Sequence, residues 1–191
     1  MRVRLIIDRI HRDESGSMLI ELLMAMVFLA VGVGALMSLY ASTVVTMRHA
    51  STEGTALTLA ERQIEVYKTL PYDKIKLSST TIPGGSDPYV TANASDSTIP
   101  ASSGQVTGGS TSSSLCTSPS QAMPECATQT WTGPDGLAYR VDSYIVSTTP
   151  AGGRALKEVT VVVRRVESGT VTTHIWSRAT SDFDQANPPQ I

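Results

Sequence analysis

The sequence has few of the residues from which most metal and catalytic sites are built. Its 191 residues include three histidines and two cysteines. The histidines, His11, His49 and His174, lie far apart in the chain, and no second cysteine pair accompanies Cys116 and Cys126. No nucleophile-elbow sequence, cysteine–histidine pairing or phosphate-binding glycine loop is present. The sequence therefore favours a protein that is not an enzyme, and it predicts no cofactor and no metal site.

The chain also lacks a strong excess of charge of either sign. Its net charge is −2, so composition gives no sign of a nucleic-acid partner. Basic residues do gather at Arg154, Lys157, Arg164 and Arg165. This group permits contact with DNA or another anionic surface, but alternating, solvent-facing charges on a β-strand explain it at least as well.

A long stretch near the N-terminus contains almost no ionisable group. Between Leu22 and Val45 there is only the phenol of Tyr40, and there is no proline. A helix of this length extends about 36 Å, enough to cross a bilayer, and exceeds the core of a secretory signal, which is about 7–15 residues. Arginines cluster before the stretch, while Arg48 stands nearly alone after it. This asymmetry predicts a single pass with a cytoplasmic N-terminus and an extracytoplasmic remainder.

Two interpretations of the cysteines depend on this topology. Cys116 and Cys126 fit one disulfide in an exported protein, or two idle thiols in a cytosolic one. Because the predicted topology puts both outside the cytoplasm, it favours the disulfide.

One carboxylate, Glu21, lies inside the apolar stretch. A charged group in a bilayer costs a few kcal/mol, so it is expected to have a partner. In one interpretation Glu21 reaches back to the lipid headgroups. In the other, a cut after Gly16 makes Ser17 a charged N-terminus, one helical turn from Glu21. The carboxylate would then neutralise its own N-terminus or that of a neighbouring subunit.

The order of these residues resembles the prepilin processing motif of type IV pilins and pseudopilins. A basic leader, residues 1–16, ends in Gly16 and precedes an uncharged helix that opens with Ser17-Met18-Leu19-Ile20-Glu21-Leu22-Leu23. The resemblance implies that a membrane peptidase cuts after Gly16 and methylates Ser17, and that Glu21 serves assembly. The family usually has phenylalanine where this chain has Ser17, a departure that points to a minor subunit.

The same resemblance implies partners and a location. The partners are other pilin or pseudopilin subunits, the prepilin peptidase and an assembly platform in the membrane. The subunit would begin in the inner membrane and end in a filament at the cell surface or in the periplasm. An alternative from another class is a single-pass, membrane-tethered binding or sensory module that does not polymerise. Such a tether has no use for Gly16 or Glu21.

Small residues recur at intervals of four along the apolar stretch. They are Ala30, Gly34, Ser38 and Ser42. Such a strip lets membrane helices approach closely, although small residues are common enough in membrane helices for the register to arise by chance.

The remaining pattern predicts an α+β fold that resembles the pilin fold. Residues 17–46 form the transmembrane and assembly helix, and residues 47–71 continue it as an amphipathic helix ending before Pro71. Residues 72–136 form a Ser/Thr/Gly-rich variable loop region with one short strand near Tyr89–Thr91. Residues 137–180 form an antiparallel sheet of three or four strands on the helix, and 181–191 a polar tail. The predicted strands are Leu137–Val146, Ala155–Val166 and Val171–Ala179. The helix positions predicted to face the core are Ala56, Leu57, Leu59, Ala60, Ile64, Val66, Tyr67 and Leu70.

Overall fold

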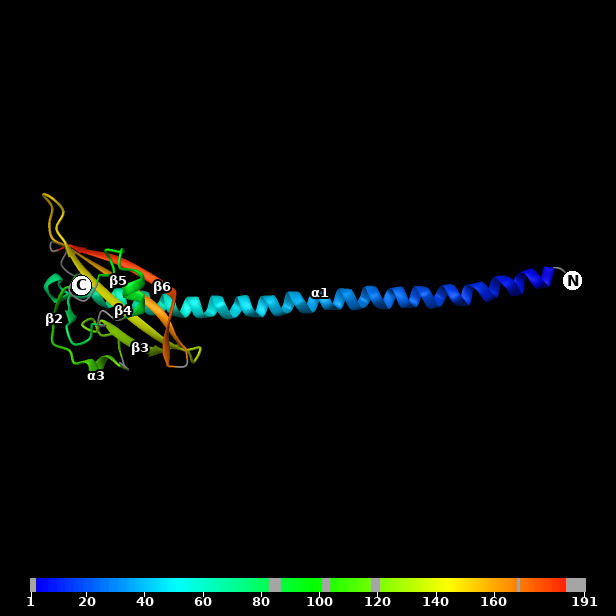
Figure 1. The fold of residues 1–191 in the computed structure, drawn as a ribbon, viewed down its shortest axis with the longest axis horizontal. Coiled ribbons are helices and arrows are strands. Elements are labelled where there is room, and N and C mark those ends of the chain that lie inside the picture. The colour runs from blue at the N-terminus through cyan, green and yellow to red at the C-terminus, as the bar shows by residue number, and fades with distance from the viewer. Residues whose placement is uncertain (1–2, 83–86, 101–103, 118–120, 168, 185–191) are drawn as a thin grey trace. The chain divides into compact units, whose positions relative to one another are not determined.

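The protein, seen in a computed structural model, contains one long helix, a four-stranded antiparallel sheet and several short elements (Figure 1). The structure describes residues 3–82, 87–100, 104–117, 121–167 and 169–184, and within them the side chains from residue 18 onward except that of Thr173. The chain divides into two compact units, Met1–His49 and Ala50–Ile191. The prediction of an α+β protein with a long N-terminal helix and an antiparallel sheet is confirmed.

Helix α1 spans Val3–Lys68 and belongs to both units. In the second unit one side of it is buried at Ala56, Ala60, Ile64 and Tyr67. These positions recur every three or four residues, which is the spacing of one helical face. The inclusion of Leu57 in this face was wrong, because its side chain is 46% exposed.

The end of α1 is fixed by proline and by a lysine. The helix ends at Lys68, and Pro71 is the N-cap of the short 3-10 helix η1, Tyr72–Lys74. Lys157 Nζ donates to the carbonyl oxygens of Tyr72 at 2.7 Å and Ile75 at 2.9 Å. The carbonyl of Tyr72 also accepts from the N–H of Ile75 at 3.3 Å, so the ammonium adds a second donor there and holds the 3-10 turn that follows α1 against β5.

The sheet has the order β3-β4-β5-β6, with every neighbouring pair antiparallel. Its strands are β3, Thr128–Thr132; β4, Ala138–Thr148; β5, Leu156–Glu167; and β6, Thr170–Asp184. The three predicted strands are present within two residues at all but one end. β3 falls in the predicted loop region, and β6 runs into the predicted polar tail, where Phe183 packs against the core. Residues 185–191 of that tail lie outside the described residues.

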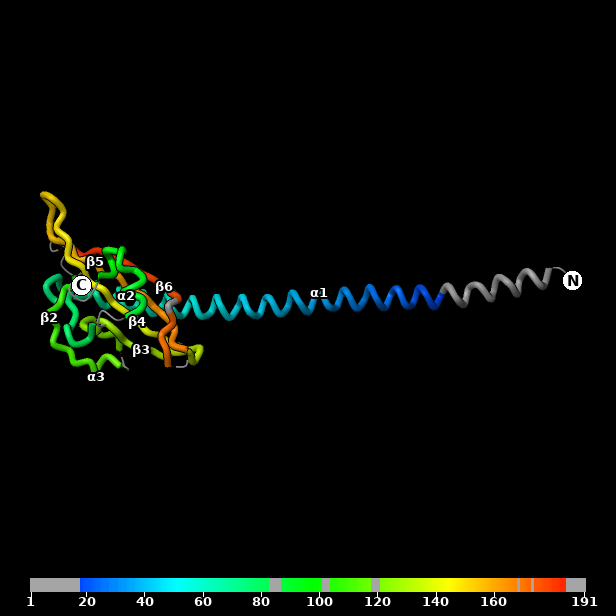
Figure 2. Tube along the Cα trace, viewed as in Figure 1, coloured from blue at the N-terminus to red at the C-terminus, as the bar shows by residue number. Residues whose placement is uncertain are grey.

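Side chains alternate between the two faces of this sheet, and both faces are covered. One face packs on α1, using Val159, Val161 and Val163 of β5. The opposite face carries Val162 of β5 and Tyr144 of β4, which pack on the segment around the short helix α2, Pro88–Ala92. Figure 2 shows this segment beside β4.

The region 72–136 is therefore more than a variable loop. It contains β3, the parallel pair of β1, Leu77–Ser78, with β2, Thr107–Gly109, and the helices α2 and α3, the latter Ser113–Cys116. Its residues Tyr89, Val90 and Ile99 form most of the second core.

The strand predicted near Tyr89 is wrong, because these residues start a helix. Asp87 caps it by accepting a hydrogen bond from the backbone N–H of Tyr89 at 2.9 Å. Pro88 occupies the first helical position, where a missing N–H does no harm. The Asp-Pro pair is thus a helix start signal that outweighs the β-propensity of Tyr89 and Val90.

A buried charge cluster fixes this segment to the sheet. Arg164 of β5 is 2% exposed, and its Nη2 lies 2.6 Å from Asp142 Oδ2 and 3.0 Å from Asp87 Oδ2. Arg140 Nη2 reaches Asp87 Oδ2 at 2.6 Å, and its Nε reaches Asp142 Oδ1 at 2.7 Å. The interpretation of the basic group as solvent-facing was therefore wrong for Arg164, and also for Lys157, which is buried.

These contacts perturb the titration of two members of the cluster. Burial alone would raise the pKa of Asp87, but the hydrogen bond and charge of Arg164 outweigh it and hold that pKa below its ordinary value of 3.8. Burial alone would lower the pKa of Arg164, but Asp87 and Asp142 raise it. Both groups are therefore charged in the folded protein at neutral pH.

Replacing Asp87 with alanine should destabilise the protein strongly. The change leaves Arg164 buried with one carboxylate instead of two, and loss of one member of a buried charge pair costs about 3–5 kcal/mol. Glu167→Ala is the matched control, because its pair with Arg165 is exposed and is expected to contribute less than about 1 kcal/mol. Urea unfolding of the full chain in mild detergent, followed by tryptophan fluorescence, measures both; equal losses would contradict the assignment.

The same comparison has a predicted pH dependence. Since the folded pKa of Asp87 lies below its ordinary value of 3.8, its charge contributes stability above that value and loses it as the pH falls through the folded pKa. The difference in unfolding free energy between wild type and Asp87→Ala should thus be constant near neutrality and shrink in acid. A difference that grows in acid would contradict this.

Candidate functional site

The apolar part of α1 exposes almost all of its side chains. From Met18 to Met47 every described side chain but Val44 is exposed. Within this stretch Glu21 is the only charged residue. The large exposed apolar residues are Met18, Leu19, Ile20, Leu22, Leu23, Met24, Met26, Val27, Phe28, Leu29, Val31, Val33, Leu36, Met37, Leu39, Tyr40, Val45 and Met47.

A helix that is apolar on every side is stable when lipid or other helices surround it. In the described part of the chain, one helix is both long enough and apolar enough to cross a membrane, judged by length and composition, and that helix is α1. The exposed surface is therefore a candidate membrane and helix-packing surface.

Hydroxyl groups near the end of this stretch are satisfied within the helix. Thr43 Oγ1 donates to the carbonyl oxygen of Leu39 at 2.9 Å, and Thr46 Oγ1 donates to that of Ser42 at 3.0 Å. In a hydrocarbon environment no water is available to accept hydrogen bonds from these hydroxyl groups. The two threonines are thus compatible with burial in lipid or among helices.

The small residues of the predicted strip, Ala30, Gly34, Ser38 and Ser42, are all exposed on α1. A Cβ added at Gly32 or Gly34 would meet nothing within 4 Å, so contacts within this chain do not explain either glycine. A role in packing against other helices stays a prediction. Glu21 is exposed as well, whereas Gly16 and Ser17 lie outside the residues whose side chains the structure describes.

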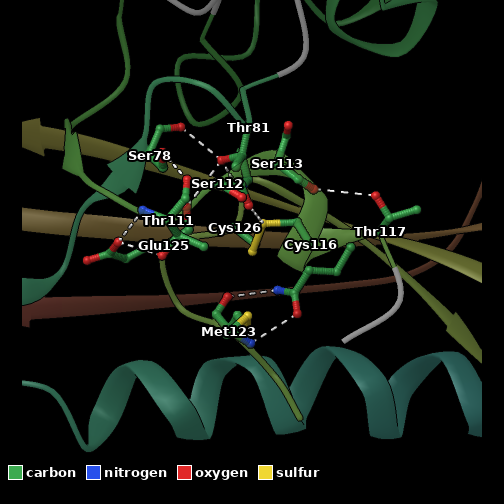
Figure 3. The surroundings of a disulfide bond; sticks show 12 residues. Ser78, Thr81, Thr111, Ser112, Ser113, Cys116, Thr117, Met123, Glu125 and Cys126 are labelled. Atoms are coloured by element: carbon green, nitrogen blue, oxygen red, sulfur yellow. Dashed lines mark hydrogen bonds between the residues drawn. A yellow bond between two sulfur atoms is a disulfide. The ribbon is translucent and has the colours of Figure 1, made fainter. Parts of the chain in front are cut away.

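In the second unit the cysteines form a disulfide, Cys116–Cys126, with 5.7 Å between their Cα atoms (Figure 3). The bridge joins α3 to the segment that leads into β3. Helix α1 holds the same segment, because Tyr67 Oη donates to the carbonyl oxygen of Pro124 at 2.7 Å and Gln63 Nε2 to that of Met123 at 3.2 Å. Burial raises the pKa of Tyr67 to about 12, so its phenol stays a donor.

Glu125 and Thr81 make further contacts that fix the segment around Cys126. Glu125 Oε2 accepts hydrogen bonds from the N–H groups of Ser110 at 2.9 Å and Thr111 at 3.0 Å, and from Thr111 Oγ1 at 2.7 Å. Because of these bonds, led by the one from the Thr111 hydroxyl, the pKa of Glu125 is lowered. Thr81 Oγ1 accepts from the N–H of Ala127 at 3.0 Å. Figure 3 shows Glu125 and Thr111 beside each other, close to the bridge.

A cavity of about 210 Å³ lies beside the disulfide. Its lining is mostly hydroxyl-bearing: Thr80, Thr81, Ser113, Cys116, Thr117, Thr128 and Thr130. Several of these hydroxyls already donate inside the protein, as Thr81 does to Ser78 and Thr128 does to Asp142. The described residues of the lining include no charged group, so they give little chemistry with which to select a ligand.

The described residues contain no group of three or more His, Cys, Asp or Glu that could hold a metal ion. His174, predicted to be a solvated strand residue, is exposed on β6, and its ring meets the edge of Trp176 at 5.1 Å between centroids. The polar residues that sequence reasoning missed are Asp87, Asp142 and Arg164, which act in folding. The Asp-Pro pair at Asp87 was the one local signal for them.

Comparisons with protein-family models, with curated proteins and with solved structures found nothing that matches the chain.

Removing the disulfide should destabilise the second unit while leaving the apolar helix unchanged. In the chain-entropy model a bridge closing so short a loop contributes about 2.5–3 kcal/mol. The double variant Cys116→Ser/Cys126→Ser should lose that amount in urea unfolding of the full chain, and Leu115→Ala, which changes an exposed neighbour, should lose far less. Equal stability of the double variant and wild type would show that the bridge does not restrain the unfolded chain.

Proposed function

We propose that the chain is a non-enzymatic structural subunit, of the minor kind, of a type IV pilus or pseudopilus. The observation that carries the proposal is the exposed apolar stretch of α1 with a single carboxylate, Glu21, near its start. A plain membrane anchor gains nothing from a carboxylate at that depth. In a subunit that docks by its helix, the carboxylate of Glu21 is a charged partner for its own N-terminus or for that of a neighbouring subunit.

Several features support this proposal together. The leader ends at Gly16, so a cut there places the new α-amino group of Ser17 one helical turn from Glu21. The strip from Ala30 to Ser42 offers a close-packing side for other subunits. The second unit is a folded body with a buried core, which is what a subunit would present outside the membrane. Prepilin peptidase, an assembly platform and other pilin or pseudopilin subunits are the proposed partners.

The mature protein should begin at Ser17 and carry a methyl group on its α-amino nitrogen. Intact-mass analysis of protein isolated from its native envelope measures this directly. Gly16→Leu is the informative variant, since it should keep the leader and still enter the membrane. An intact Met1 end in the wild type, or a cut close to Ala41, would contradict the proposed processing.

Replacing Glu21 with alanine should prevent assembly without harming membrane insertion. A simple anchor should tolerate the change, because it removes a group that is costly to bury. In a filament the change leaves the Ser17 ammonium unpaired among packed helices, at a cost of about 3–5 kcal/mol. The variant should therefore be found in membranes and be nearly absent from sheared filaments, with Glu21→Asp intermediate.

Glu53→Ala is the matched control, because Glu53 is an exposed carboxylate on the same helix beyond the apolar stretch. It should enter filaments as the wild type does. Equal recovery of Glu21→Ala and wild type would reject Glu21 as the docking group. If neither wild type nor variant leaves the membrane fraction, the tethered, non-polymerising module is the better reading of the chain.

A further inference from the structure

The two cysteines of the disulfide are held to the rest of the protein to very different degrees. Cys116 ends the short helix α3, and Cys126 lies just before β3 (Figure 3). Once the bridge is made, both side chains are buried, with 4% of Cys116 and 0% of Cys126 exposed. The contacts around each sulfur therefore decide which thiol another molecule can reach before the bridge exists.

Cys126 is fixed on both sides along the chain. The residue after it, Ala127, is fully buried, and its N–H donates to Thr81 Oγ1 at 3.0 Å. The carbonyl oxygen of Ala127 accepts from the N–H of Ser143 of β4 at 2.8 Å. The residue before it is Glu125, whose carbonyl oxygen accepts from a backbone N–H of β1, also at 2.8 Å. Moving Cys126 outward therefore means breaking contacts with two strands and with Thr81.

The segment that carries the other cysteine, residues 112–117, is held much less. In the described part of the chain its hydrogen bonds stay within the segment, as from the N–H of Leu115 to the carbonyl oxygen of Ser112 at 3.2 Å. Thr117 Oγ1 likewise donates to the carbonyl oxygen of Ser113 at 3.4 Å. The large apolar side chain of the segment, Leu115, is 57% exposed. The disulfide is thus the main described connection between this segment and the sheet.

The space between α3 and the sheet is also incompletely filled. The cavity of about 210 Å³ beside the disulfide is lined by Ser113 of α3 and by Thr128 and Thr130 of β3. Neither apolar core cluster includes a described residue of α3. Because little apolar area holds α3 in place, we expect it to move away from β3 readily when the bridge is absent.

We propose that Cys116 is the sulfur that meets the oxidant when the disulfide is made, and that Cys126 is the sulfur that closes the bridge. The oxidant is a disulfide of another molecule. The Cys116 thiolate attacks it, which forms a mixed disulfide and releases one thiolate of the oxidant. The Cys126 thiolate then attacks the Cys116 sulfur, forms the bridge and expels the second thiolate. The two cysteine thiols lose two protons and two electrons, and the oxidant takes up both and ends as two thiols.

The order follows from access. Exchange requires that the incoming disulfide come into direct contact with the attacking thiolate. Cys116 meets this requirement when α3 moves, which leaves the sheet intact. The return of α3 to β3 then brings the mixed disulfide to Cys126, which has stayed in its place.

Two single-cysteine variants of the full chain, kept reduced in mild detergent, test the difference in access. Cys126→Ser leaves the Cys116 thiol, and Cys116→Ser leaves the Cys126 thiol. The probe is 5,5′-dithiobis(2-nitrobenzoic acid), an aromatic disulfide that releases a coloured thiolate. Cys116 should react at least about tenfold faster, because local opening of α3 exposes it whereas Cys126 needs a larger opening. In enough urea to unfold the sheet the two rates should converge, since only intrinsic thiol reactivity then remains.

A change at Thr81 tests the part assigned to Cys126. Thr81→Val removes the hydroxyl that accepts from Ala127 and keeps the shape of the side chain. It should speed the reaction of Cys126 in the Cys116→Ser background and leave that of Cys116 unchanged in the Cys126→Ser background. Leu115→Ala, which changes an exposed side chain, should leave the rate at Cys126 unchanged. A rate at Cys126 that does not respond to Thr81→Val would overturn its assignment as the held partner.

The wild-type chain tests the order without any substitution. It is reduced in urea, returned to native conditions, mixed with glutathione disulfide and quenched in acid at early times. Peptide mass analysis should then find glutathione on Cys116. Glutathione mainly on Cys126, or equal reaction of the two single-cysteine variants in the folded state, would overturn the proposal. These outcomes do not depend on Ser17 or Glu21, so they are separate from those that test the proposed function.

Discussion

Helix α1 has to satisfy two different surroundings without a break in its backbone. From Met18 to Met47 its side chains are apolar on every side, so water is a poor solvent for it. From Thr52 onward only one side is buried, and polar residues such as Glu61 and Lys68 occupy the other. The packing of the sheet and the anchoring of the segment around Cys126 both depend on that second, one-sided part, which ends before Pro71. The core of the second unit therefore forms between the sheet and the amphipathic half of α1.

The opposite face of the sheet depends on charge rather than on area alone. Burying Arg164 is unfavourable unless carboxylates surround it, and Asp87 and Asp142 do so from different parts of the chain. A well-packed apolar core of similar volume is often as stable as such a cluster. We infer that the cluster contributes specificity: Asp87 is the residue that selects where the Ser/Thr-rich segment meets the sheet. Tyr89 strengthens this contact, with its ring 4.7 Å from the Arg164 guanidinium.

Sequence periodicity predicted the elements whose pattern is local. The apolar stretch, the buried side of α1 and the strands β4, β5 and β6 follow from runs of residues with one repeat. Leu57 was misplaced because it lies at the edge of the predicted apolar arc, next to Ala56, where a rotation of the helix decides burial. β3 was missed because the sequence Thr-Gln-Thr-Trp-Thr resembles the Thr-rich loops around it.

The charge cluster was missed for a different physical reason. Arg164 follows three consecutive valines and precedes Arg165, so no alternation in the sequence shows which face of β5 it lies on. Its partners lie 77 and 22 positions away. No local window contains that information. Glu21 and the small-residue strip are the reverse case: the sequence identifies them, but their expected partners are other molecules, so a single chain offers no contact that tests them.

The way the central region is attached has a consequence for how its sequence can change over time. Between Ser78 and Cys126 the chain is held at a few points: Asp87 with its neighbours Tyr89 and Val90, Ile99, Glu125 and the disulfide. Most of the described serines, threonines and glycines between those points are exposed. Substitutions, insertions and deletions in these stretches leave the core packing unchanged, because the contacts that hold the segment are made at the named points. The surface sequence of these stretches can therefore diverge while the core stays the same.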